Sequence, residues 1–126
     1  MKYLKRAYAN EQEHYQSVAG ILSGAGVTPA VSSDIDYTYP KGAFASQASI
    51  LKLAQRLETI MLGTYLGAVG GMQSGAFKQG LAQIAASEAQ HLSYMWTENG
   101  LKAFNAAFPA ALTIDQASAA MDAFTV

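Results

Sequence analysis

The sequence predicts an all-α fold: a helical bundle with three long core helices and a short C-terminal helix. Two observations favour this class. Apolar residues recur at steps of three and four in three long segments, which is the period of an amphipathic helix. No segment alternates convincingly between apolar and polar residues, as a half-buried strand does. We therefore expect residues 1–126 to form one bundle domain, and a hydrophobic content of 51% supplies its core.

The first helix is expected from residue 2 to about residue 23. Its apolar stripe, the face expected to pack into the core, comprises Leu4, Tyr8, Glu11, Tyr15, Val18 and Leu22. Gly24 and Gly26 should end this helix. Residues 25–45 contain two prolines, two glycines and a cluster of Ser, Asp and Thr, so they predict a long connection that crosses a surface or carries function.

Two further long helices follow, one from about Ser46 to Val69 and one from about Ala76 to Glu98, joined by the short turn "GGMQSG". The stripe of the earlier helix comprises Leu51, Ala54, Glu58, Met61 or Leu62, Tyr65 and Val69. The stripe of the later helix comprises Leu81, Ile84, Glu88, His91 and Met95. The glycines of "GTYLGAVGG" follow no strand and are no phosphate loop, so we expect them to allow close helix approach.

The end of the chain carries two local signals. Asn99-Gly100 should stop the third long helix. Thr113 and Gln116 have the spacing of a capping box, in which each side chain bonds the other residue's backbone N–H, so a short final helix is expected.

Composition excludes several classes of protein. The net charge of −1 and the pI of about 6.0 give no field that would attract nucleic acid. The absence of cysteine excludes thiolate catalysis, zinc–thiolate sites, iron–sulfur clusters and disulfides. The longest apolar run, residues 60–72, is too short to cross a bilayer, so no transmembrane segment is expected. The start "MKYLKR" runs into "AYANEQEH", which is not the apolar region of a signal peptide.

Five ionisable residues fall within the predicted apolar stripes: Glu11, His14, Glu58, Glu88 and His91. The other charged residues of these helices lie off the stripes, as surface charges should. Burying an unpaired carboxylate costs several kcal/mol, so five such groups on three helices need mutual compensation.

The spacing Glu-x-x-His places a carboxylate and an imidazole on one helical face, about one turn apart, where both can bind a single ion. Glu11–His14 and Glu88–His91 both have this spacing, and Glu58 adds a carboxylate. One such motif is common, and a lone histidine on an apolar stripe is more often a hydrogen-bonded core residue. Two motifs with an extra glutamate favour a dinuclear non-haem iron or manganese site. Structural zinc sites would more often bring cysteine.

Three segments, "ANEQEHYQSVAGIL", "LETIMLGTYLGAV" and "IAASEAQHLSYM", resemble the second, third and fourth core helices of the ferritin-like superfamily. The long connection and the tail "FPAALTIDQASAAMDAF" resemble its desiccation-related bacterial branch. The resemblance implies that Glu11 and His14 bind one metal ion, that Glu88 and His91 hold the other half of the site, and that Glu58 is the third-helix carboxylate. Members of that branch are often exported, which implies a periplasmic or exported location.

The family pattern includes a further, first helix that carries its own glutamate, and this sequence shows no counterpart of it. The domain is therefore expected to be incomplete, with three glutamates where the full ligand set has four. We expect the absent helix to come from upstream sequence or from a second polypeptide, which a homo-oligomer could supply.

Two functions are compatible with these patterns. In the first, the dinuclear site reacts with oxygen or peroxide, or the protein handles iron. In the second, the chain is a metal-free structural or interaction subunit of a larger assembly, and its glutamates and histidines pair with one another. The low content of charged residues, 13%, and the absent helix both motivate the second.

Overall fold

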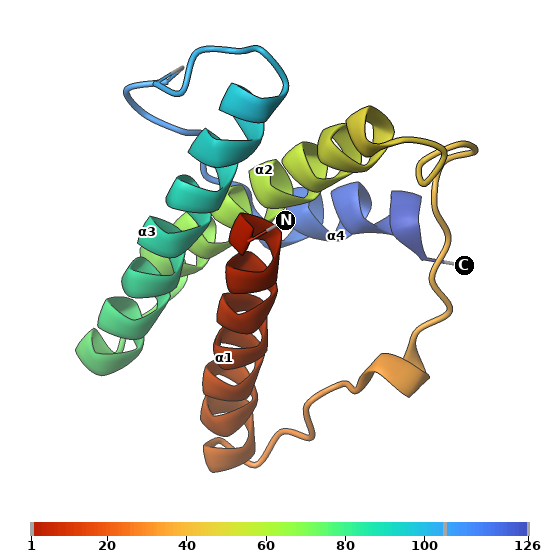
Figure 1. The fold of residues 1–126 in the computed structure, drawn as a ribbon. Coiled ribbons are helices and arrows are strands. Elements are labelled where there is room, and N and C mark those ends of the chain that lie inside the picture. The colour runs from red at the N-terminus through yellow and green to blue at the C-terminus, as the bar shows by residue number, and fades with distance from the viewer. Residues whose placement is uncertain (1, 105, 126) are drawn as a thin grey trace. The chain divides into compact units, whose positions relative to one another are not determined.

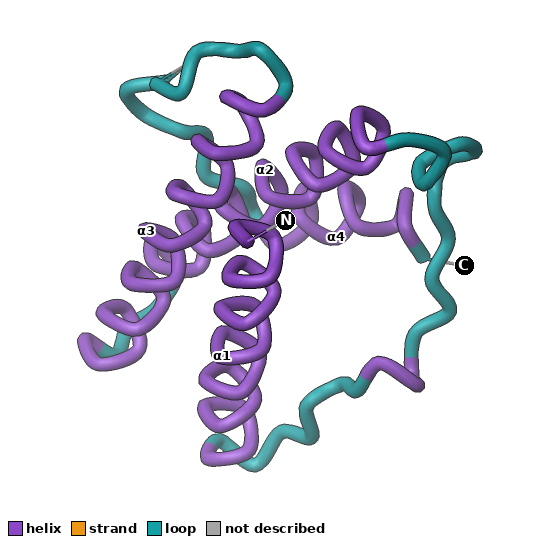
Figure 2. The backbone as a smooth tube through the Cα atoms, in the orientation of Figure 1, coloured by secondary structure: helices purple, strands orange, loops and turns teal. Residues whose placement is uncertain are grey.

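The computed structural model describes residues 2–104 and 106–125, and within them it is all-helical (Figures 1 and 2). Its elements, in chain order, are α1 (Lys2–Gly24), η1 (Ser32–Asp34), α2 (Gln47–Gly71), α3 (Gly75–Glu98), α4 (Ile114–Met121) and η2 (Asp122–Phe124), where η denotes a short 3₁₀ helix. An isolated bridge joins Tyr37 to Thr125, and the described ranges contain no strand. The predicted class, three long helices and a short C-terminal one, is confirmed.

The chain forms two compact units, an N-terminal unit, Met1–Ile35, and a C-terminal unit, Asp36–Val126. In the N-terminal unit, α1 ends in a Schellman motif, a closing turn in which two backbone N–H groups bond back to the last carbonyls. The Val27 N–H donates to the Leu22 carbonyl at 2.9 Å and the Gly26 N–H donates to the Ser23 carbonyl at 3.0 Å. Gly26 has φ 77°, a conformation that glycine adopts without strain. The predicted end of the first helix is confirmed.

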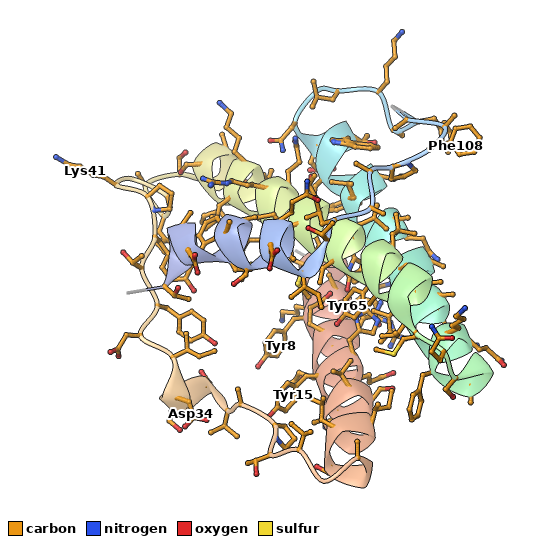
Figure 3. The ribbon with its side chains drawn as sticks, turned by 180° about the vertical axis from the view of Figure 1, so that it is seen from behind. Tyr8, Tyr15, Asp34, Lys41, Tyr65 and Phe108 are labelled. Atoms are coloured by element: carbon orange, nitrogen blue, oxygen red, sulfur yellow. The ribbon has the colours of Figure 1, made fainter. Side chains whose placement is uncertain are left out.

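The connection after α1 is held by side chains of its own unit (Figure 3). The Tyr15 hydroxyl donates to the Ala30 carbonyl at 3.0 Å, and the Asp34 carboxylate accepts from the Val31 N–H at 2.9 Å. Tyr8 and Tyr15 belong to the predicted stripe, yet both are exposed. A tyrosine can hydrogen-bond its hydroxyl at the surface in this way. The helical spacing of Tyr8 and Tyr15 therefore predicted more burial than these two side chains have.

In the C-terminal unit, α2 and α3 form a helical hairpin, with residues 72–74 as the turn between them (Figure 1). Ser46 caps α2 by accepting from the Ser49 N–H at 3.1 Å. Leu62 of α2 packs with Ala85 and Leu92 of α3 in the buried cluster between the two helices. The predicted stripe of α3 is confirmed, because all five of its members are buried: Leu81, Ile84, Glu88, His91 and Met95.

Asn99 closes α3 and ties its end to the start of α2. Its side-chain amide donates to the Leu51 carbonyl at 3.2 Å and to the Gln55 side-chain oxygen at 2.8 Å. Gly100 follows with φ 74°. The predicted Asn-Gly stop is therefore confirmed, and it also joins two helices.

The C-terminal segment returns across α2. Thr113 caps α4, because its hydroxyl accepts from the Gln116 N–H at 3.2 Å and the Gln116 side chain accepts from the Thr113 N–H at 2.9 Å, as the capping box predicts. Phe124 is almost fully buried, and the Arg56 guanidinium lies 4.7 Å from the centre of its ring. The chain end is therefore anchored on the first half of α2.

Two glycines of α2 allow a very close approach, although not by another helix as the sequence suggested. The extended peptide at Leu112 lies on Gly63 and Gly67, and the Leu112 N–H donates to the Gly63 carbonyl at 2.8 Å. A Cβ atom on Gly67 would lie 1.8 Å from the Leu112 carbonyl oxygen. An extended backbone, which is thinner than a helix, needs this bare surface to reach the α2 carbonyl.

No helix of the described chain is both long enough and apolar enough to cross a membrane.

Gly67→Ala is expected to lower the free energy of unfolding by about 1–3 kcal/mol, because the added methyl group must displace the Leu112 peptide. Gly80→Ala in α3 is the matched control, since in the described part of the chain nothing beyond its own helical turns lies within 4 Å of its added Cβ. The control should raise stability by about 0.5–1 kcal/mol, through helix propensity alone. Urea unfolding followed by circular dichroism measures both changes, and equal effects of the two substitutions would contradict the packing described for Leu112.

Candidate metal centre

The buried face of α3 carries two ionisable side chains one turn apart. Glu88 is 0% exposed and His91 is 8% exposed. The neighbouring buried residues of α3 are apolar, which places the pair in the low-dielectric interior of the hairpin. A carboxylate and an imidazole placed there need a partner that balances their charge.

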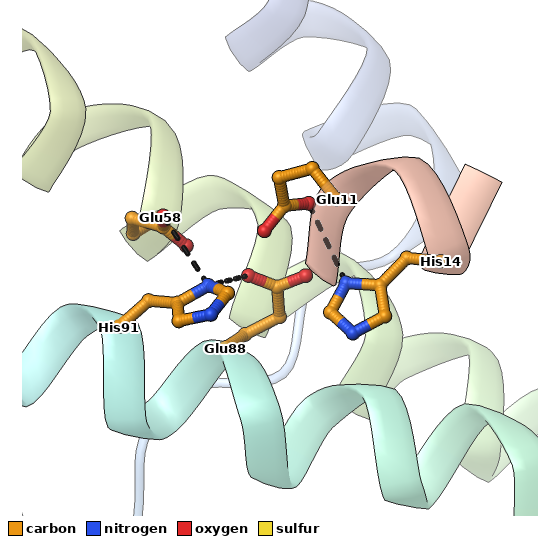
Figure 4. Close-up of polar contacts among 5 residues, drawn as sticks. All are labelled: Glu11, His14, Glu58, Glu88 and His91. Carbon is orange, nitrogen blue, oxygen red and sulfur yellow. Dashed lines mark ion pairs between the residues drawn. The ribbon is translucent and has the colours of Figure 1, made fainter. Parts of the chain in front are cut away.

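Glu58 of α2 completes a group of three in the C-terminal unit (Figure 4). His91 Nδ1 lies 3.4 Å from Glu88 Oε2 and 3.5 Å from Glu58 Oε1. Each of the three residues offers one ligand atom within 4.8 Å of those of the other two. The structure thus brings together three of the five residues that the sequence singled out, from positions thirty residues apart.

The remaining two residues form a pair in the N-terminal unit. His14 Nδ1 lies 3.5 Å from Glu11 Oε2 on successive turns of α1 (Figure 4). This distance matches the one between His91 and Glu88, and the same ring nitrogen faces the carboxylate in both pairs. Both Glu-x-x-His motifs therefore adopt the same local geometry.

These distances fit atoms that share one metal ion. Ligand atoms at about 2.1 Å from a metal are separated by about 3.0 Å at neighbouring octahedral positions and by about 3.4 Å in a tetrahedron. The observed separations, 3.4 and 3.5 Å, exceed the usual N–H···O hydrogen-bond distance of about 2.7–3.2 Å. In addition, Glu58 Oε2 is buried and has no hydrogen-bond partner among the residues that the structure describes. The donor set therefore fits a cation.

The net charge of these three residues also fits a cation. Glu58 and Glu88 share a single imidazole, so the group of three carries −2 with a neutral His91 and −1 with a protonated one. A divalent ion would balance the two carboxylates and leave the imidazole neutral, which is the form in which histidine binds a metal. Two carboxylates and one imidazole suit iron or manganese, and the absence of cysteine removes thiolate ligands.

Two tyrosines near the stripes have contacts of an ordinary structural kind. Tyr65 packs against the Leu62–Ala85–Leu92 cluster, and the Tyr15 hydroxyl bonds to the Ala30 carbonyl. Neither contact requires a redox role. Met95 is buried and Trp96 packs beside the same cluster, as expected for packing residues.

Fold and site together define a class: a helical protein with two largely buried carboxylates and an imidazole at distances compatible with a metal site. Comparison with protein families places the chain more narrowly. The model of the ferritin-like domain matches residues 1–119, and the chain belongs to this family. A comparison with curated proteins found no match.

Glu88→Gln is expected to weaken binding of Mn²⁺ by about 100-fold or more, because it removes a charged oxygen donor, and even residues outside the ligand shell contribute about 10–100-fold. Glu98→Gln is the matched control, since Glu98 lies exposed at the end of the same helix. Isothermal titration calorimetry with both variants measures the difference. Equal affinities for Mn²⁺ would contradict a role for Glu88 as a ligand.

Proposed function

We propose that this protein holds a dinuclear iron or manganese site whose ligands are Glu11, His14, Glu58, Glu88 and His91. The proposal treats residues 1–126 as one bundle domain whose three long helices all supply ligands. Its main support is the position of His91 Nδ1, 3.4 and 3.5 Å from two carboxylates that are both largely buried. Membership of the ferritin-like family supports the same reading.

The imidazoles and the carboxylates have different roles in this proposal. The imidazoles of His14 and His91 would hold the metal ions through Nδ1, the atom that faces a carboxylate in both motifs. Glu11, Glu58 and Glu88 would balance the charge of the ions, and Glu88, which is fully buried, holds its carboxylate away from water. Leu62 and Leu92 seal the hairpin beside the group. When bound, the metal pair supplies redox chemistry toward oxygen or peroxide, or a place where iron is handled.

Metal analysis of protein purified without chelators tests the proposal directly. Roughly two equivalents of iron or manganese per chain are expected, either as purified or after reconstitution. Less than roughly a tenth of an equivalent, with no uptake on reconstitution, would overturn it.

The second candidate is a metal-free structural or interaction subunit of a larger assembly. Its support is that each histidine already lies at ion-pair distance from a glutamate of its own motif, so the pairs have partners without a metal. In that case the two Glu-x-x-His motifs stabilise the helices and their packing. The chain would then act through the surface that it offers to the other subunits of the assembly.

Glu58→Gln separates the two candidates. At a hundredfold excess over Kd, a bound ion stabilises the folded protein by about 2.7 kcal/mol, which raises the melting temperature of a domain of this size by about ten degrees. The metal site predicts that added Mn²⁺ gives this rise in the unsubstituted protein and little or none in Glu58→Gln. Thermal unfolding with and without Mn²⁺ measures it, and an equal effect of the substitution in both conditions favours the structural subunit.

We further propose that a fourth helix bearing a glutamate completes the bundle, supplied by upstream sequence or by a second polypeptide. The described residues contain three long helices and three glutamates of the proposed site, whereas the full ligand set has four. For this chain alone, native mass spectrometry should show the metal-loaded particle at more than 13.3 kDa of protein. A stable monomer of that mass with two bound ions would contradict this proposal and leave the metal site intact.

A further inference from the structure

The connection between α3 and α4 carries the most exposed aromatic side chains of the C-terminal unit. Phe104 is 95% exposed and Phe108 is 93% exposed. Figure 3 shows Phe108 at the edge of this unit, and in Figure 1 the connection projects beyond the end of α3. Soluble domains expose single apolar residues often, but two almost bare phenyl rings four residues apart mark an interaction surface.

This connection is held at both ends. Near its start the Ser93 hydroxyl donates to the Ala103 carbonyl at 3.2 Å, and at its end the Leu112 N–H donates to the Gly63 carbonyl at 2.8 Å. The two rings are therefore carried by a segment that is anchored to both α3 and α2. Such anchoring reduces the entropy that a binding partner would otherwise have to remove.

An apolar pocket of about 350 Å³ is lined by residues of this connection together with residues of α2 and α3. Leu92 and Trp96 of α3 form one part of its wall, and Ala106 and Pro109 of the connection form another. Thr59 also lines it, but its hydroxyl already donates to the Gln55 carbonyl at 2.8 Å. The walls therefore favour a hydrocarbon group over a polar one. A cavity of about 150 Å³ is enough for a benzene ring, so this pocket has room for two.

The rings and the pocket belong to one patch of surface, since Phe108 precedes the wall residue Pro109 and the wall residue Ala106 lies between the two rings in sequence. A patch that carries both the projecting group and its receptor is self-complementary, which is the requirement for a two-fold symmetric interface. We propose that two copies of this chain associate by placing Phe104 and Phe108 of each copy into the Trp96-lined pocket of the other.

The area is sufficient for a stable dimer. Four phenylalanine rings bury about 150–250 Å² each, and with an equal area of receiving surface the interface reaches about 1,200–2,000 Å². That is the range of specific protein–protein interfaces. Residues 101–114 contain one charge, Lys102, so two copies meet without appreciable repulsion. A single lysine is also too little for an anionic membrane surface, which attracts clusters of basic residues.

Trp96 is the only tryptophan of the chain, and it lines the pocket, so its fluorescence reports on this interface. Sedimentation velocity over rising protein concentration should show particles of twice the 13.3 kDa monomer mass. The emission of Trp96 should shift to shorter wavelength over the same concentration range, because the entering rings displace water. A dimer that forms without a change in Trp96 emission would overturn the proposal.

The double variant Phe104→Ser/Phe108→Ser should dissociate at least about 100-fold more readily, since buried aromatic anchors dominate interface energies. Both side chains are almost fully exposed, so their removal should not affect folding. Phe44→Ser, which removes an exposed phenylalanine of the same unit that lies outside the pocket, should leave association unchanged. Association of the double variant at the unsubstituted affinity would overturn the proposal.

Ala120→Phe tests the receiving side, because Ala120 lines the pocket and a ring attached there fills it from within. This variant keeps Phe104 and Phe108 and should still be monomeric. Mixed with the double variant, which has open pockets, it should form mixed dimers that neither variant forms alone. The absence of such dimers, or binding of the monomer to vesicles of phosphatidylcholine and phosphatidylglycerol that the double variant loses, would overturn the proposal.

Discussion

The sharing of one imidazole by two largely buried carboxylates is the constraint on which the C-terminal unit depends. Glu88 has no exposed surface, and His91 Nδ1 faces both it and Glu58. Burying such a group costs free energy, because its charged atoms lose their hydration and apolar packing around them does not compensate for that loss. It therefore requires a hairpin that holds α2 and α3 in a fixed register, which the Leu62–Ala85–Leu92 cluster provides on one side and Asn99 at the end of α3 provides on the other.

Most of the fold was predictable because its signals are local. Helix limits followed from Gly26, from Asn99-Gly100 and from the Thr113–Gln116 capping box, each of which acts within a few residues. The close approach on α2 was only partly predictable. Glycines in a helix indicate that another segment packs closely there, but they do not indicate which segment. At Gly67 it is the extended peptide of Leu112, forty-five residues away in sequence, and not a helix.

In the candidate site, too, local signals and long-range contacts differed in how far the sequence predicted them. The i, i+3 spacing alone predicted that Glu88 would lie beside His91, and that Glu11 would lie beside His14. Adding Glu58 required the phase of α2 against α3, which the apolar stripes supplied. The exposed rings of Phe104 and Phe108 escaped sequence reasoning altogether, because a phenylalanine in an alanine-rich stretch is usually taken for a core residue, and the sequence alone does not show that the backbone turns it toward solvent.

The brevity of the turn between α2 and α3 has a consequence for the order in which the protein acquires its structure. Residues 72–74 leave little chain entropy to lose when the two helices meet, and contacts of short sequence separation form fast. Glu58, Glu88 and His91 all belong to this hairpin, whereas α1 is separated from it by the connection that precedes Gln47. We therefore expect the group of three to assemble early in refolding, ahead of any contribution from α1. Pulsed hydrogen exchange would then show amide protection in α2 and α3 before protection in α1, and the reverse order would exclude this route.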